Sequence, residues 1–401
     1  MWVNGPVGLG AEGRVLRPGC RSVLVVVPFV VAGTRLMDVL PLLEADHRLM
    51  TVFTVAPAAN GANCHGVEEF LRTAGGLVIP WAQAVQTEFD IILATSATGV
   101  AQLRGTVVML PHGAGAVPAR RRALARHTFA REELTCSGRV MPSLLVLSHD
   151  AELAELEAQC PEVRDRALVA GDIVYDRLVA SVPFRDRYRD AFGLRDNQQL
   201  VVLSSTWGPE SAFGRYFNLA DRLVAELNPG RYRVAVALHP NIWSVHGEFQ
   251  VRAWLADALC AGLLLLPPEE GWRAALVAAD VLIGDHGSVT RYGAALGRRL
   301  LLTPAGSAGL LGSCASRLRP ELPLTDQVAT ARREAWQADL GGRLTSHPGR
   351  AGQILRRALY RLLDLPEPAR AVPVSPVPLP NPITAEPRFP GRPDTVHAKR
   401  A

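Results

Sequence analysis

Lysine is almost absent from this sequence: Lys399 is the one lysine among 43 basic residues, and the others are arginines. The arginines are dispersed along the chain, and aromatic residues make up only 6% of it. Nucleic-acid-binding surfaces combine clustered basic side chains with aromatic ones that stack on bases. Despite a formal net charge of +5, the sequence therefore argues against nucleic acid as a partner, and the arginine bias is more typical of coding composition.

Cysteine pairs and long hydrophobic runs are also missing. The six cysteines, at positions 20, 64, 136, 160, 260 and 314, form no C-x-x-C pair, so neither a zinc ribbon nor a disulfide framework is indicated. The longest apolar run, residues 22–33, is too short to span a bilayer as a helix, and the segment before it lacks the order of a secretory signal. We expect a globular cytoplasmic protein.

Apolar runs typical of strands alternate with helix-like segments along most of the 401 residues. Hydrophobic residues make up 48% of the chain, which is enough for two domain cores. The first set of predicted strands lies at 22–31, 49–55, 77–79, 90–94, 106–110, 143–148 and 167–170. The second set lies at 200–207, 232–240, 263–266, 280–285 and 299–302. This alternation predicts an α/β protein with two Rossmann-like domains, each built on a parallel doubly wound sheet.

Composition shifts suggest the domain boundaries. Residues 1–20 are rich in glycine and predict a flexible leader, and the polar, arginine-rich stretch 183–199 predicts a linker between the domains. The first domain then covers 21–182 and the second 200–348. Residues 349–365 contain an amphipathic helix that would close the fold by packing across the domains. Ten of the 36 residues from Pro366 onward are proline, which predicts a disordered tail over 366–401.

Histidines follow four of the predicted strands, where the carboxyl ends of a parallel sheet bind ligands. They are His112, His149, His239 and His286. A histidine in such a position also serves as a simple turn or helix cap, and the sequence Ser-His-Asp around His149 favours that interpretation for this residue.

His112 is the strongest candidate for a general base. Pro111 fixes the chain where the strand ends, and Gly113 and Gly115 remove side-chain bulk, so a substrate could approach the imidazole closely. An unperturbed pKa near 6.5 suits the removal of a proton from a hydroxyl group. The alternative is a glycine-rich loop whose histidine only fills space.

The second domain offers candidates for binding phosphate. A protonated His239 could bind a diphosphate, and the strand-to-helix turn at 284–288 brings Asp285 and Ser288 to a helix N-terminus, where unpaired N–H groups attract anions. Gly287 would let the ligand approach the backbone. The alternative for Asp285 and Ser288 is ordinary helix capping.

A third polar loop follows the strand at 200–207. Thr206 could touch a phosphate or the acceptor, and Trp207 could stack on a ligand or pack into the core.

Two further ideas are weaker. Three of the strand-end histidines (His112, His239 and His286) could bind zinc, but they lack ligand spacing, so no metal is expected. The arginine-rich stretch 118–129 could meet a polyanionic acceptor or an anionic membrane, or it could be a solvated helix face. Its four arginines are Arg120, Arg121, Arg122 and Arg126.

Taken in order, these loops resemble the CDP-glycerol glycerophosphotransferase-like family, the teichoic-acid polymerases and primases of GT-B fold. The order and rough spacing agree over residues 105–302. The matching elements are His112-Gly113, "GDIVYDRL" at 171–178, Thr206-Trp207, His239-Pro240 and "ADVLIGDHGSVTRYGAALGRR" at 279–299.

The resemblance implies a GT-B enzyme of cell-envelope polymer synthesis with no tightly bound cofactor. It would move a glycerophosphate, polyol-phosphate or glycosyl group from a CDP- or UDP-linked donor to a hydroxyl acceptor. His112 with Gly113 would form the catalytic loop. Thr206-Trp207, His239 and residues 285–288 would bind the donor diphosphate. A lipid-linked acceptor and peripheral contact with the inner membrane face are compatible with this interpretation.

The chain departs from the family pattern at several of these positions. His286-Gly287 replaces a Tyr-Ser pair, Tyr292 replaces an acidic residue, and Gly208 replaces an arginine. The donor preference can therefore differ. Two alternatives stay open: a UDP-sugar 2-epimerase-like isomerase, which would need acidic residues beside the cleft, and a GT-B-like protein that binds nucleotide without turnover.

Overall fold

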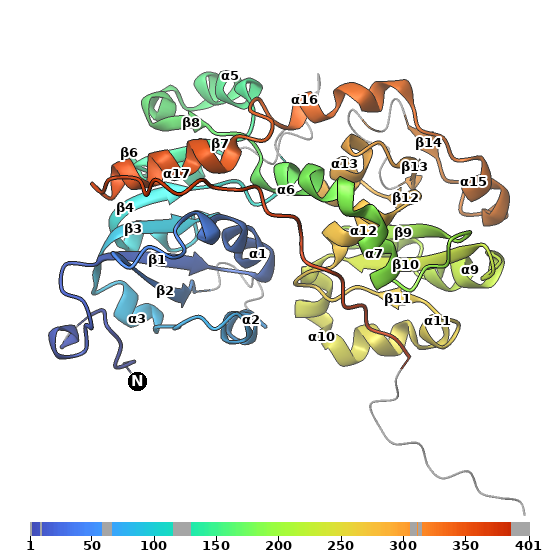
Figure 1. The fold of residues 1–401 in the computed structure, drawn as a ribbon, viewed down its shortest axis with the longest axis horizontal. Coiled ribbons are helices and arrows are strands. Elements are labelled where there is room, and N and C mark those ends of the chain that lie inside the picture. Colours follow the sequence, from blue (N-terminus) through green and yellow to red (C-terminus); the bar gives the residue numbers. More distant parts are fainter. Residues whose placement is uncertain are drawn as a thin grey trace, which may run out of the picture.

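Two parallel six-stranded sheets form the centre of the molecule. This computed structural model describes residues 2–8, 10–57, 66–114, 130–304, 311 and 315–385. The first sheet has the order β2-β1-β3-β4-β7-β8, with β1 (Arg21–Val27), β2 (Leu49–Val55), β3 (Glu88–Ala94), β4 (Arg104–Met109), β7 (Leu144–Leu147) and β8 (Ala167–Val169). The second has the order β11-β10-β9-β12-β13-β14, with β9 (Gln199–Ser205), β10 (Tyr232–Leu238), β11 (Leu264–Leu265), β12 (Val281–Gly284), β13 (Arg299–Leu302) and β14 (Ser316–Arg317). Figure 1 shows the two halves side by side, the first in blue to green with α17 in red-orange, and the second mainly in green to orange. The predicted fold class is confirmed.

Helices cover both faces of each sheet. The first domain contains α1 (Val30–Val39), α2 (Val67–Thr73), α3 (Trp81–Ala84), α4 (Arg131–Leu134), α5 (Asp150–Gln159) and a small hairpin of β5 (Thr135–Cys136) and β6 (Arg139–Val140). The second contains α8 (Ala212–Arg215), α9 (Leu219–Glu226), α10 (Pro240–Trp254), α11 (Ala256–Cys260), α12 (Trp272–Ala278), α13 (Ser288–Ala295), α15 (Leu324–Thr330) and α16 (Gly341–Leu344). None of the described helices has both the length and the apolar character needed to cross a bilayer.

Strand periodicity explains why each sheet has a core on both faces. Successive side chains of a strand point to opposite faces. Val23 and Val25 of β1 thus enter one core while Leu24 enters the other. In β9, Val201 and Val202 divide in the same way.

Two predicted strands differ most from the observed elements. β1 ends at Val27 instead of continuing to Val31, because Pro28 follows and has no N–H group for the ladder. Residues 77–79 form only an isolated bridge, between Val78 and Phe53.

The chain enters the second domain earlier than the expected linker at 183–199. α6 (Ile173–Ser181) and α7 (Arg185–Ala191) contribute Val174, Leu178 and Tyr188 to a core that also contains Leu200 and Leu282 of the second sheet. α6 therefore already shares the core of the second sheet, although it precedes the stretch 183–199 where we predicted the linker.

α17 (Ala351–Leu362) returns to the first domain. Its residues Leu355, Leu359 and Tyr360 pack with Val23 and Val25 of β1. This helix therefore completes the first domain's core, and its first residue also contacts α6, where Ala351 N donates to Asp176 Oδ2 at 3.0 Å.

The two termini depart from the expectation of disorder. In the leader, Val7 is buried and Val3 exchanges backbone hydrogen bonds with the side chain of Gln83. In the tail, residues 366–385 run as an extended segment from α17 past α6 to β11 (Figure 1), with Val377 buried and Ile383 paired with Leu265. Proline-rich chain is extended without internal hydrogen bonds, so its carbonyl groups are available to side chains along its path. Residues 386–401 lie outside the described part of the chain.

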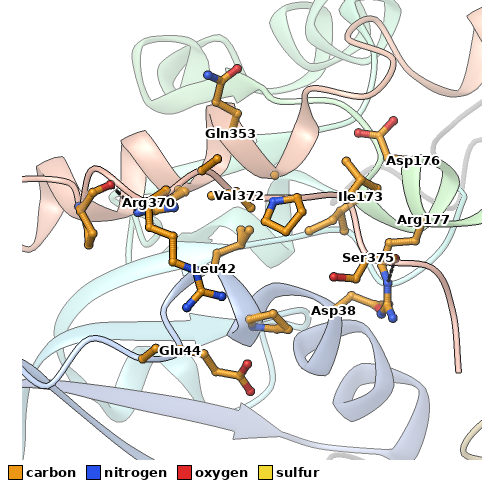
Figure 2. Close-up of a pocket in the computed structure, with 18 of the residues that line it drawn as sticks. Asp38, Leu42, Glu44, Ile173, Asp176, Arg177, Gln353, Arg370, Val372 and Ser375 are labelled. Carbon is orange, nitrogen blue, oxygen red and sulfur yellow. Dashed lines mark hydrogen bonds and ion pairs between the residues drawn. The ribbon is translucent and has the colours of Figure 1, made fainter. Parts of the chain in front are cut away.

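A cavity of about 520 Å³ lies between α1, α6, α17 and this tail segment. Figure 2 shows Arg177 of α6 beside Asp38 and Ser375. Arg177 forms an ion pair with Asp38, and its Nε donates to the carbonyl oxygen of Ser375. The tail is thereby tied to α6 and, through Asp38, to α1.

Candidate functional site

A second cavity, of about 320 Å³, lies between the two domains at the carboxyl ends of the strands. Eight of the nine predicted site residues line it: His112, Gly113, Thr206, Trp207, His239, His286, Gly287 and Ser288. Asp285 is the ninth and is not part of the cavity wall. Loops from both sheets therefore meet at one place.

His112 has the arrangement of a base. Its Nδ1 lies 3.1 Å from the carbonyl oxygen of Thr95. Because a carbonyl oxygen can only accept, Nδ1 carries the hydrogen and the lone pair of the neutral ring lies on Nε2. Desolvation between the two domains lowers the pKa of His112, and the charge of Arg35 lowers it further. Both effects favour the neutral ring.

The loop that carries His112 is held at both ends. Before His112, the carbonyl oxygen of Pro111 accepts from Nε of Arg35 at 3.1 Å. After it, the backbone N–H of Ala114 donates to Ser288 Oγ of the second domain at 3.1 Å. A Cβ added at Gly113 would lie 2.7 Å from Ser288 Oγ. Gly113 therefore permits the close approach of the two domains.

His239 presents the opposite tautomer. It caps α10, and its Nδ1 accepts from the backbone N–H of Asn241 at 3.1 Å. In the neutral ring the hydrogen is then on Nε2, which can donate to a ligand. Burial lowers the pKa of His239 to about 4 against an opposing effect of Asp285. The expectation of a protonated imidazole thus does not hold for the free protein, where His239 is a neutral donor.

Asp285 is fully buried and lies beneath the cavity. Its Oδ2 accepts from Thr206 N at 2.8 Å, Thr206 Oγ1 at 2.7 Å and Ala212 N at 3.0 Å. Its Oδ1 accepts from Gly287 N at 3.1 Å. Since four protein donors occupy the carboxylate, Asp285 holds two loops together. This differs from both the expected donor contact and simple capping of α13.

The N-terminus of α13 opens on the cavity. Gly287 is the N-cap and Ser288 the first helical residue. A Cβ at Gly287 would lie 2.8 Å from the methyl carbon of Thr206, so glycine is needed for this packing. The bond from Ala114 uses only the oxygen of Ser288, so the hydroxyl hydrogen can serve a ligand. Helix N–H groups and dipole favour an anion here.

Trp207 lies at the cavity rim with 55% of its surface exposed. Its ring centroid is 6.4 Å from that of His239. The alternative that Trp207 packs into the core is therefore wrong, and the ring is free to contact a ligand. Thr206 donates its hydroxyl to Asp285, which leaves its methyl group toward Gly287.

Three charged residues that were not predicted also line the cavity: Arg35 and Asp38 of α1 and Arg273 of α12. Arg35 pairs with Asp172, and Arg273 pairs with Asp38 and Glu270. The available signal was a pair of opposite charges three residues apart in the otherwise apolar stretch 30–39. A buried charge of this kind needs a partner.

His149 has the capping role that its sequence favoured. Its Nδ1 accepts from Ala151 N at 2.9 Å at the start of α5. Within the described ranges, no group of three or more His, Cys, Asp or Glu side chains could hold a metal ion. The arginine-rich stretch 118–129 lies outside those ranges.

Comparison with known proteins identifies a shared fold. No family model matches the chain, and no curated protein matches it. Among solved structures, the wall teichoic acid polymerase TagF has a TM-score of 0.57 at 12% identity, covering 86% of this chain and 89% of that one. TagF soaked with CDPG gives 0.55 at 12% identity, covering 86% and 89%. S. aureus MnaA in a co-structure with UDP gives 0.52 at 10% identity, covering 86% and 98%. At these identities the likeness shows the two-domain GT-B fold.

Proposed function

We propose that the chain is a GT-B transferase that moves a glycerophosphate, polyol-phosphate or glycosyl group from a nucleotide-diphosphate donor to a hydroxyl acceptor. The observation that carries this proposal is the pairing of opposite tautomers in one cavity. His112 offers an unprotonated Nε2, and His239 offers an Nε2–H group beside the N-terminus of α13.

The second domain would bind the donor. The diphosphate would lie at the start of α13, accepting from the helix N–H groups, from Ser288 and from His239. The same groups would stabilise the charge that develops on the departing nucleotide. Negative phosphate near His239 would also raise its pKa from about 4. Trp207 at the rim is placed to stack on a base or sugar.

The first domain would activate the acceptor. Nε2 of His112 would take the hydroxyl proton as the acceptor oxygen attacks the phosphorus or anomeric carbon. One bond forms to the acceptor oxygen, and the bond to the nucleotide leaving group breaks. Because desolvation lowers the pKa of His112, the unprotonated form of this base is favoured before the reaction.

The cavity wall favours a transferase over an epimerase. Among the described lining residues, Asp38 supplies the only carboxylate. It forms ion pairs with Arg177 and Arg273. An epimerase-like reaction would need a freer acid beside the sugar. Two named neighbours support a nucleotide ligand, since TagF was soaked with CDPG and MnaA was determined with UDP.

A panel of CDP- and UDP-linked donors, with and without polyol-phosphate acceptors, tests the proposal. We expect nucleotide release that depends on the acceptor, measured by chromatography. Conversion of a UDP-sugar without acceptor, followed by NMR, would instead support the isomerase. Nucleotide binding without any conversion would support a binding protein.

A further inference from the structure

One face of α13 makes two hydrogen bonds to the segments that hold the His112 loop in place. Ser288 and Tyr292 lie four residues apart, so their side chains project from the same side of the helix. Ser288 Oγ accepts from Ala114 N at 3.1 Å, and Tyr292 OH donates to Asp172 Oδ2 at 2.7 Å. α13 therefore touches the catalytic loop directly and the crossover segment one turn later.

A buried chain of hydrogen bonds continues from Asp172 to the catalytic loop. Asp172 Oδ1 accepts from Arg35 Nη2 at 3.1 Å, and Arg35 Nε donates to the carbonyl oxygen of Pro111 at 3.1 Å. The exposed fractions are 2% for Tyr292, 0% for Asp172 and 6% for Arg35. Asp172 is further fixed because it caps α6 through Val174 N. The bond from Tyr292 thus reaches the peptide group that precedes His112.

The phenol hydroxyl can be removed without changing the packing of the ring. Tyr292 stacks on Trp272 with a centroid separation of 5.9 Å and an interplanar angle of 25°. Phenylalanine would keep this contact and lose the hydroxyl group's interactions with Asp172 and Arg35. Tyr360 provides a matched control away from the cavity that contains His112. Its hydroxyl donates to Asp46 Oδ2 at 2.8 Å, and its side chain is also buried.

We propose that the hydrogen bonds through Tyr292, Asp172 and Arg35 make the position of His112 depend on the position of α13. Tyr292 is then a positioning residue for the transfer reaction, and this part of the inference rests on the proposed function. The N-terminus of α13 would hold the donor phosphates. The same helix would therefore also fix the position of His112, the base that activates the acceptor. Donor binding and base placement are coupled through one element.

The positive charge of Arg35 provides a second way to test these hydrogen bonds, because it affects the pKa of His112. Among the residues that the structure describes, the charged or titratable groups facing His112 are Arg35 from α1, Glu133 from α4 and His239 from the second domain. Arg35 lowers the pKa of His112, whereas Glu133 raises it. Replacing Arg35 with glutamine removes the repelling charge, so the pKa of His112 rises.

The kinetic test compares Tyr292→Phe with Tyr360→Phe in the full chain. We expect Tyr292→Phe to lower kcat for acceptor-dependent nucleotide release about 10- to 100-fold, because a small displacement of the base has effects of this size. The KM for the donor should change by less than about threefold, since the donor groups remain. Tyr360→Phe should retain wild-type kcat. Equal kcat values for Tyr292→Phe and wild type would overturn the proposal.

NMR of histidine-labelled protein gives a readout that needs no turnover. The His112 ring signal is assigned by its loss in His112→Ala. We expect Tyr292→Phe to shift or broaden it, Tyr360→Phe to leave it unchanged, and Arg35→Gln to raise its pKa by at least about 0.5 unit. A signal identical in Tyr292→Phe and wild type would refute the coupling even in an active enzyme. The expected changes in a protein without turnover would uphold the coupling and reject the proposed transferase.

Discussion

At the scale of single residues, the two cavity histidines differ because their Nδ1 atoms meet opposite partners. A carbonyl oxygen faces Nδ1 of His112, and a backbone N–H faces Nδ1 of His239. One cavity therefore contains a nitrogen that accepts a proton and a nitrogen that donates a hydrogen bond. Acid–base chemistry on a bound substrate needs this combination.

His239 makes the stability of the protein depend on pH. Its pKa is lowered from 6.5 to about 4, so the unfolded chain binds a proton more readily than the folded one between these values. The stabilisation is fully present above pH 6.5 and is lost as the pH falls to 4. It amounts to about 3 kcal/mol. We expect the free energy of unfolding of His239→Gln to fall less between pH 7.5 and 4 than that of the wild type. Urea unfolding at a series of pH values measures this.

A suitable control is His149→Gln, which changes another strand-end histidine that caps a helix outside the cavity. His112 contributes a slope of the same sign, because its pKa is also lowered. The free energy of unfolding of His239→Gln should therefore still depend on pH, but less steeply than that of the wild type. If its slope between pH 6.5 and 4 matched that of the wild type, the buried neutral state of His239 would be refuted.

Sequence could locate these histidines but not assign their roles. Placement at strand ends followed from the apolar runs before His112 and His239. The tautomers depend on Thr95, which is 17 residues before His112, and on the backbone at Asn241. Asp285 was expected to contact the donor because nothing in the sequence shows that Thr206 and Ala212 fold back onto it.

At the scale of elements, the turn after β12 and the loop after β9 form one unit through Asp285. The carboxylate accepts from both segments. The end of β12, the start of α13 and the Thr206-Trp207 loop are thereby fixed to one another. Preorganised donors for an anion depend on such rigidity.

Replacing Asp285 by asparagine should loosen this unit. The amide nitrogen of asparagine cannot accept, so at least one buried backbone N–H loses its partner at a cost of about 1–3 kcal/mol. We expect a lower free energy of unfolding by chemical denaturation and weaker binding of nucleoside diphosphates by calorimetry.

Asp221→Asn is the matched control for this change. Oδ1 of Asp221 is buried and has no hydrogen-bond partner among the described residues, and burial raises the pKa of this carboxyl. The neutral amide should therefore cost little there. Equal stability and nucleotide affinity in Asp285→Asn and Asp221→Asn would contradict the role of Asp285.

Periodicity in the sequence predicted the types of most helices and strands correctly, but it did not predict the bounds of all of them. The strands at 49–55 and 299–302 have the bounds predicted. Residues 77–79 are apolar enough for a strand, yet they make a single bridge to Phe53. Amphipathicity identified α17, but its apolar face could fit either domain, and only the folded chain shows that it joins β1.

At the scale of the whole molecule, three segments connect the domains. α6 leaves the first domain, α17 returns to it, and the tail crosses again to β11 (Figure 1). Tyr188 OH donates to the carbonyl oxygen of Val377 at 2.7 Å, and Arg356 donates to the carbonyl oxygens of Pro368 and Arg370. The tail is therefore attached along its length.

Removing the tail should weaken the whole fold. Truncation after Leu365 exposes the site of Val377 and unpairs β11 from Ile383. Loss of the buried valine alone costs about 1.5–3 kcal/mol, so we expect a lower Tm by calorimetry. Truncation after Ala385 keeps both Val377 and Ile383, so we expect it to leave the Tm unchanged. The same Tm for both truncations would show that the tail does not stabilise the fold.

Whole-molecule arrangement was the least predictable level. Alternating strands and helices identified two parallel sheets, because that pattern is local. Proline content indicated an extended tail, but order depends on partners such as Tyr188 and Leu265, more than a hundred residues away. Crossover points likewise depend on which core accepts Val174 and Leu178.

The central claim is that His112 removes the acceptor proton in a nucleotide-dependent transfer. The most direct measurement is the acceptor-dependent rate of nucleotide release by wild type, His112→Ala and His149→Ala with the donor that the panel identifies. We predict a loss of about 10²- to 10⁴-fold in His112→Ala, unchanged donor affinity, and near wild-type rates in His149→Ala. A wild-type rate in His112→Ala would contradict the account.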